Sequence, residues 1–111
     1  MNKKICVAFI SKKLKKEFES LKSGKFENKN LHGFINNAID GLKKDPFCGV
    51  KIKKILWPKI YVQKYSVTNL WKYNLPSGWR LIYTIETDEV RIVNIVLEWF
   101  NHKEYEKTFN Y

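Results

Sequence analysis

The sequence predicts an α+β fold, in which an N-terminal strand and a helical hairpin pack on a curved, mainly antiparallel sheet that precedes a short C-terminal helix. Three observations predict it: apolar residues recur at helical spacing before Gly49, they alternate with polar residues after it, and a helix-capping pattern follows the last apolar run. A chain of 111 residues suffices for one hydrophobic core, so we expect a single domain over residues 1–111.

The first part of the chain predicts a strand and two helices. Ile5–Ile10 is short, apolar and flanked by lysines, which is typical of a strand buried on both faces. Ser11 is suited to cap a helix that ends before Gly24, and Asp45-Pro46 ends a second helix, so the two form a hairpin. Their apolar stripes are Leu14, Phe18 and Leu21 in the first helix, and Leu31, Phe34, Ile35, Ala38, Ile39 and Leu42 in the second.

The second part predicts antiparallel strands joined by turns. Alternating patterns predict strands around Val50–Ile52 and over residues 61–67, and further strands are expected at 70–75 and 79–85 on either side of a turn at 76–78. Residues 86–89 are polar enough to form the next hairpin loop, and 90–100 is the longest apolar run, which favours a central strand. Asn101 and Glu104 have capping-box spacing and predict the terminal helix.

The charge favours a polyanionic partner. The net charge is +10 and the pI about 9.6, which indicates nucleic acid, although 19 of the 21 basic residues are lysine and an AT-rich genome would produce the same bias. Cys6 and Cys48 have neither disulfide-framework nor zinc spacing, so we expect a reducing cytoplasm and no metal site. The N-terminal apolar patch is too short for a signal peptide, and no run is long enough to cross a membrane.

His102 is the first candidate for chemistry, because an imidazole exchanges protons near neutral pH. It follows the cap Asn101, where the helix dipole favours the neutral ring, and Tyr105 lies on the same helical face. The pair suits acid–base work or stacking on a nucleotide base. An exposed histidine beside a half-buried tyrosine, with no function, is the alternative.

Arg80 is one of two arginines, and a guanidinium binds phosphate with two parallel hydrogen bonds. Strand alternation places it opposite the apolar face of Trp79, Leu81, Tyr83 and Ile85, toward a groove or solvent. The other arginine, Arg91, lies near Glu89 and fits a surface ion pair. We therefore favour Arg80 as the functional cation.

Lysines and aromatic residues interleave between positions 51 and 65. This mixture fits a single-stranded RNA surface, or else the wet face of a strand; it comprises Lys51, Lys53, Lys54, Lys59 and Lys64 with Trp57, Tyr61 and Tyr65. Glu98 sits among apolar neighbours, where it either pairs across the sheet or acts as a base, and His32 fits a structural role. No phosphate-binding glycine loop, zinc ligand set or nucleophile elbow is present, which argues against nucleotide hydrolases and metal-dependent hydrolases.

Two segments together resemble a known family. The stretches LWKYNLPSGWRLIYTI, residues 70–85, and VRIVNIVLEWFNHKEYEKTF, residues 90–109, resemble the RelE/ParE superfamily of toxins. The family signature of a turn, an aromatic residue, arginine, an aliphatic residue, any residue and tyrosine matches Trp79–Tyr83. The histidine, basic residue and tyrosine that follow the last strand in the family match His102, Lys103 and Tyr105.

The resemblance implies a cytoplasmic endoribonuclease that cuts messenger RNA on the ribosome, needs no metal or cofactor, and is neutralised by a small acidic antitoxin. The resemblance further implies that Arg80 stabilises the phosphorane, that His102 transfers a proton and that Tyr105 holds the nucleotide. Phosphate contacts fall to Lys103, Lys54, Lys59 and Lys64. Three alternatives remain: a gyrase-directed toxin of the same fold, a basic nucleic-acid-binding module, and an inactive relative.

Overall fold

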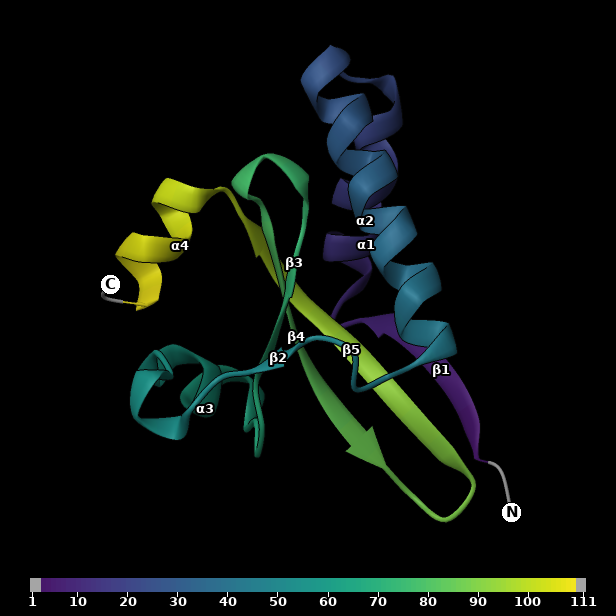
Figure 1. Ribbon diagram of the computed structural model, residues 1–111, viewed down its shortest axis with the longest axis vertical. Helices are drawn as coiled ribbons and strands as arrows, with labels where there is room; N and C mark the ends of the chain where they lie inside the picture. Colours follow the sequence, from purple (N-terminus) through teal and green to yellow (C-terminus); the bar gives the residue numbers. More distant parts are fainter. Residues whose placement is uncertain (1–2, 110–111) are drawn as a thin grey trace.

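The computed structural model describes residues 3–109 and shows an α+β fold built on one five-stranded mixed sheet (Figure 1). The strand order is β1-β5-β4-β3-β2; β1 runs parallel to β5, and the other neighbours are antiparallel. The strands are β1 Lys4–Phe9, β2 Val50–Lys51, β3 Trp71–Asn74, β4 Arg80–Thr87 and β5 Arg91–Phe100. The α-helices are α1 Lys12–Ser20, α2 Phe26–Lys44, α3 Lys59–Tyr65 and α4 His102–Phe109.

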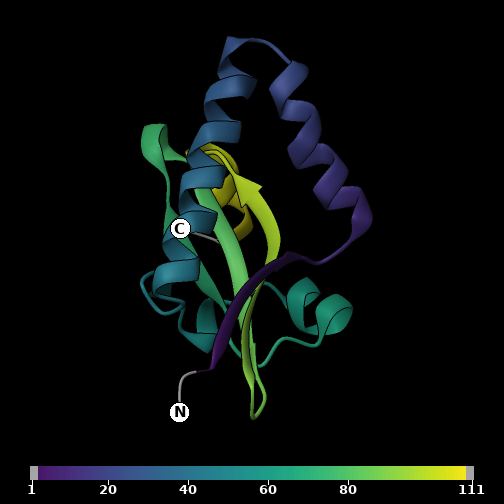
Figure 2. The same cartoon turned by 90° about the vertical axis from the view of Figure 1, so that its right-hand side faces the viewer.

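The helical hairpin covers one face of the sheet, as Figures 1 and 2 show. Ser11 caps α1, since its hydroxyl accepts the Leu14 amide at 3.1 Å, and the predicted Asp45-Pro46 stop ends α2 at Lys44. The predicted apolar face of β4 packs against this hairpin. The buried cluster consists of Phe18, Leu31, Ile35, Ala38, Leu42, Leu75, Leu81, Tyr83, Ile85 and Val96.

The helices α3 and α4 cover the opposite face. A second buried cluster lies there, made of Ile52, Tyr61, Val67, Leu70, Ile82, Leu97, Tyr105 and Phe109. The predicted capping box starts α4, because the Asn101 side chain accepts the Glu104 amide at 2.8 Å and the Glu104 carboxylate accepts the Asn101 amide at 3.1 Å. Both faces of the central strands are therefore covered, which explains the long apolar run of β5.

One predicted strand is a helix, and the predicted N-terminal strand is confirmed but is less buried than expected. Residues 61–67 fall mostly in the helix α3, which starts after Pro58 and ends at Ser66 in the left-handed conformation, φ 52°. Tyr61 and Tyr65 alternate like strand residues, but their four-residue spacing also places both rings on one helical face, where their centroids are 6.2 Å apart. The strand β1 lies at the sheet edge and is only partly buried, so it is not covered on both faces.

Smaller expectations have clear outcomes. The strand predicted around Val50–Ile52 contributes two residues to β2, and β4 extends to Thr87, which shortens the predicted loop. The structural role expected for His32 is confirmed, because its ring stacks on Phe18 with a centroid distance of 4.4 Å. Arg91 forms the expected surface ion pair, and its partner is Asp88, with the guanidinium nitrogen 3.2 Å from the carboxylate.

Candidate functional site

The turn between β3 and β4 brings Arg80 and His102 together. Gly78 has a φ of 79°, which favours glycine, and its carbonyl accepts a hydrogen bond from Arg80 Nη1 at 2.8 Å. A Cβ atom on Gly78 would lie 3.1 Å from the Cβ of His102, so the turn also touches the first residue of α4. One glycine thus separates the two side chains that the sequence singled out.

The guanidinium of Arg80 is held in place on one side and unpaired on another. Nη1 also donates to the Trp79 carbonyl at 3.2 Å. Nε is buried, and among the described residues it has no hydrogen-bond partner. A buried unpaired donor costs about 1–3 kcal/mol.

Tyr105 lies beneath these cations instead of facing solvent. Its ring is only 2% exposed and stacks on Phe109, with the centroids 4.6 Å apart. The Arg80 guanidinium carbon is 5.5 Å from the ring centroid, and the Lys72 ammonium is 5.1 Å from it. The expectation that Tyr105 stacks on a nucleotide therefore does not fit, because packing covers the ring.

His102 is exposed at the start of α4, and its Nε2 pairs with the Glu106 carboxylate one helical turn later. This pair restricts the orientation of the imidazole, and the other ring nitrogen, Nδ1, remains the atom for exchange with a ligand. Lys103 is exposed beside it. The arrangement suits a histidine that moves protons at the protein surface.

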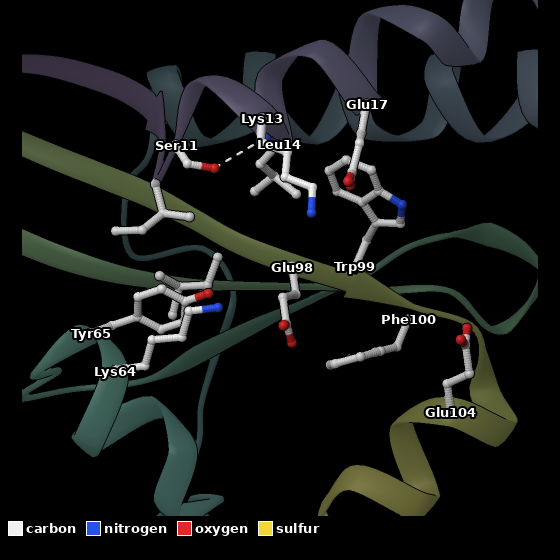
Figure 3. A pocket seen from close by; sticks show the side chains of 12 residues that line it. Ser11, Lys13, Leu14, Glu17, Lys64, Tyr65, Glu98, Trp99, Phe100 and Glu104 are labelled. Carbon is white, nitrogen blue, oxygen red and sulfur yellow. Dashed lines mark hydrogen bonds between the residues drawn. The ribbon is translucent and has the colours of Figure 1, made fainter.

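A cavity of about 330 Å³ opens beside the end of β5, and its lining includes Glu98 and Phe100 from the face of Arg80 and Trp99 from the opposite face. It lies between the start of α1, the end of α3, β5 and the start of α4, and Figure 3 shows the Glu98 carboxylate pointing into it. In the β4–β5 register Arg80 pairs with Phe100 and Ile82 pairs with Glu98, which places the guanidinium and this carboxylate on neighbouring pairs of one face. The charged and aromatic lining residues are Lys13, Glu17, Lys64, Tyr65, Glu98, Trp99, Phe100 and Glu104.

Glu98 is anchored by a phenol. The hydroxyl of the fully buried Tyr61 donates to Glu98 Oε2 at 2.6 Å, and burial, followed by this hydrogen bond, raises the pKa of Tyr61. The phenol therefore stays protonated and keeps the carboxylate in position. Of the two sequence interpretations of Glu98, pairing with a basic residue is replaced by pairing with Tyr61, and its use as a base remains open.

The cavity combines three kinds of group that can bind a phosphodiester or act on it. Glu98 is a proton acceptor, Lys13 and Lys64 are cations, and Tyr65 and Phe100 supply aromatic surface. Sequence reasoning named Lys64 and Glu98 but missed Lys13 and Phe100. These residues come from three separate elements, α1, α3 and β5, so only the tertiary fold brings them together.

The other predicted phosphate ligands lie elsewhere. Lys54 and Lys59 line shallow hollows beside Trp57, and neither Arg80 nor His102 belongs to those linings. Lys64 instead lines the cavity that holds Glu98, although Arg80 and His102 are not among the residues that line that cavity. A helix inserted where a strand was expected explains the separation, because α3 turns Lys59 and Lys64 in different directions.

Comparisons of the chain with family models, with curated proteins and with solved structures find no significant match. Within residues 3–109 no helix has the length and apolar character needed to cross a membrane. The same described range contains no group of three or more His, Cys, Asp or Glu side chains arranged to hold a metal ion.

Proposed function

We propose that this chain is a RelE/ParE-like toxin that cuts messenger RNA on the ribosome in the cytoplasm and is neutralised by a small acidic partner protein. One observation carries the proposal: Arg80 and Glu98 occupy neighbouring register pairs on one sheet face, and His102 adjoins Arg80 across Gly78. A permanent cation, a carboxylate and an imidazole are the groups that transesterification of RNA uses.

In the proposed reaction, the carboxylate of Glu98 takes the proton of a ribose 2′-hydroxyl. The resulting O2′ attacks the adjacent phosphorus, and Arg80 stabilises the charge that gathers on the phosphorane oxygens. The bond from phosphorus to O5′ then breaks, and His102 gives O5′ its proton. The products are a 2′,3′-cyclic phosphate and a 5′-hydroxyl end.

Each remaining site residue has a supporting part. Lys64 and Lys13 at the cavity, and Lys103 beside His102, contact flanking phosphates. Tyr105 positions the Arg80 guanidinium by packing under it. Lys54 and Lys59 have no part in the reaction.

The test is cleavage of a defined message on programmed ribosomes, mapped by primer extension. We expect cleavage by the unchanged chain, and a loss of about 10²-fold or more in Arg80→Lys, Glu98→Gln and His102→Gln, each checked for folding by thermal melting. Arg91→Lys is the matched control. Arg91 pairs with Asp88 on the surface, so this variant should cleave the message as the unchanged chain does. Full activity in Arg80→Lys together with Glu98→Gln would refute the site.

A non-catalytic toxin or nucleic-acid-binding protein of the same fold is the second candidate. The observation that favours it is the double anchoring of Arg80 Nη1 on two carbonyls above a buried Tyr105 ring. It predicts RNA binding or inhibition of gyrase supercoiling, with no cut message, and equal effects of the unchanged chain and His102→Gln.

A further inference from the structure

Three aromatic rings pack in a row beneath the proposed site. Tyr61 comes from α3, and Phe109 and Tyr105 come from α4, two helices that Figure 1 shows on the same side of the sheet. The centroid of the Phe109 ring lies 6.1 Å from that of Tyr61 and 4.6 Å from that of Tyr105, so Phe109 contacts both neighbours. All three side chains are at most 2% exposed, so close packing leaves this aromatic row little freedom to move.

One end of the aromatic row holds Glu98. The Tyr61 hydroxyl donates to Glu98 Oε2 at 2.6 Å, a distance typical of a hydroxyl bound to a carboxylate. Because packing holds the Tyr61 ring, its hydroxyl is a fixed point to which the carboxylate is tied. The bond occupies Oε2, so Oε1 is the oxygen that accepts the ribose proton in the proposed reaction.

The other end of the row lies under Arg80. The Arg80 guanidinium carbon is 5.5 Å from the centroid of the Tyr105 ring, a distance at which the ring attracts the cation. The carbonyls of Gly78 and Trp79 bind Nη1 from the turn, and the Tyr105 ring supports the guanidinium from α4. The aromatic row therefore touches both the cation and the carboxylate of the proposed site.

The strands alone do not fix the distance between these two charged groups. The β4–β5 register places Arg80 one pair away from Glu98, but it determines only where their backbones lie. Both side chains are long, and each has several rotatable bonds about which the charged end can turn. Contacts at the charged ends remove this freedom, and the aromatic row supplies one such contact to each side chain.

We propose that Tyr61 and Phe109 are positioning residues of the proposed reaction: Tyr61 orients the Glu98 carboxylate, and Phe109 fixes Tyr61 relative to the ring under Arg80. Both residues are buried, so neither touches the RNA. Their contribution is geometric, because the rate of a catalysed reaction depends steeply on how the catalytic group is oriented toward the reacting atoms. This inference rests on the proposed function.

The first experiment measures kcat and KM for cleavage on programmed ribosomes. Tyr61→Phe removes one oxygen and keeps the ring, so it should lower kcat by about tenfold or more and leave KM unchanged. Tyr83→Phe is the matched control, because it removes the same atom from a fully buried ring in the cluster on the opposite sheet face, and it should cut normally. An unchanged kcat in Tyr61→Phe, or equal losses in the two variants, would overturn the proposal.

A second comparison separates positioning from packing. In a chain that already carries Glu98→Ala, Tyr61→Phe should cause no further loss of the residual rate, since the phenol acts only through that carboxylate. A further loss as large as the one that Tyr61→Phe causes alone would show that Tyr61 merely supports the fold, and the positioning role would fail.

Phe109→Leu tests the middle of the aromatic row. Leucine keeps an apolar side chain at this position but removes the flat ring, so kcat should fall by about tenfold with KM unchanged. Phe18→Leu is the control, because it makes the same change at a buried phenylalanine of the other cluster and should retain the kcat of the unchanged chain. Equal kcat values in these two variants would overturn the role of Phe109.

Unfolding measured without ribosomes tests the hydrogen bond between Tyr61 and Glu98 itself. Tyr61→Phe, Glu98→Ala and the double variant should shift the thermal midpoint non-additively, because either single change already breaks the bond. Additive shifts in a chain that cuts message would overturn this inference and leave the proposed function standing. No cleavage by the unchanged chain, together with non-additive shifts, would instead overturn the proposed function and, with it, the positioning role.

Discussion

Two glycines in the described chain differ in what surrounds them. A Cβ atom on Gly49 would lie 2.0 Å from the Tyr83 hydroxyl and 2.7 Å from the Lys72 carbonyl oxygen. Around Gly33, inside α2, no described atom other than those of its chain neighbours and its own helical backbone lies within 4 Å of that position. The same substitution should therefore have opposite effects at the two sites.

Gly49→Ala should destabilise the protein by about 2 kcal/mol or more, because the buried Tyr83 ring and the β3 backbone have to move. Gly33→Ala should stabilise it by about 0.5–1 kcal/mol, because alanine loses less backbone entropy in a helix. Urea unfolding of both variants measures the two changes. Equal stability of the two variants would contradict the close packing around Gly49.

At the scale of elements, the contact between α1 and α2 contains a partly buried titratable group, His32. The His32 ring stacks on Phe18, and within residues 3–109 its buried Nε2 has no hydrogen-bond partner. Burial lowers the pKa of His32 from its ordinary value of 6.5, and the Lys22 ammonium lowers it further. The native state thus holds this imidazole neutral under conditions where the unfolded chain binds a proton.

Stability should therefore fall as the pH drops below 6.5, since there the unfolded state takes up a proton that the folded state refuses. Denaturant unfolding between pH 7 and pH 5 measures the effect, and His32→Phe, which keeps a ring on Phe18, should remove it. The pKa of Asp88 is lowered from 3.8 by backbone hydrogen bonds, so its contribution is lost only at more acidic pH. An unchanged pH slope in His32→Phe would show that other groups cause it.

Helices that begin with a capping residue were predictable from the sequence. Segments whose apolar spacing fits both a helix and a strand were not. Ser11 at α1 and Asn101 with Glu104 at α4 are caps that use neighbouring backbone, so sequence alone located both helix starts. The segment 61–67 fits helical and strand periodicity equally well. In the structure most of it is helical, and Tyr61 and Tyr65 pack in the second cluster. The apolar composition of β1 predicts burial on both faces, but composition does not specify that the strand lies at the sheet edge, where its residues are only partly buried.

The candidate site was predictable in part for the same reason. Arg80 and His102 were singled out by residue type and by position after strands, and the turn at Gly78 does bring them together. Lys13 lies far from Glu98 in sequence, so their common cavity depends on how α1 crosses β5. The burial of Tyr105 depends on the Arg80 and Lys72 side chains that lie over its ring, which helical spacing alone does not reveal.

For the whole molecule, the positive charge is unevenly distributed along the chain. Residues 46–85 hold seven basic and no acidic residues, whereas residues 86–111 hold three basic and six acidic ones. The fold places β4 from the first of these segments beside β5 from the second, so Arg80 lies one register pair from Glu98 on the same face, and His102 pairs with Glu106. The cations would attract the phosphates of an RNA strand bound there, and a carboxylate would accept a proton from its ribose.

This arrangement predicts a steep salt dependence of single-stranded RNA binding. If Arg80, Lys13, Lys64 and Lys103 each neutralise a phosphate, the affinity should fall roughly 50-fold between about 50 and 200 mM salt, because each contact on a single strand contributes a slope of about −0.7 in the logarithm. Filter binding of oligouridine over a salt series measures the slope, and Lys64→Gln should reduce its magnitude by about 0.7. Lys29→Gln, an exposed change in α2 away from the cavity, is the control and should leave the slope unchanged. Equal reductions in the two variants would mean that RNA is held by net charge alone and not at this face of the sheet.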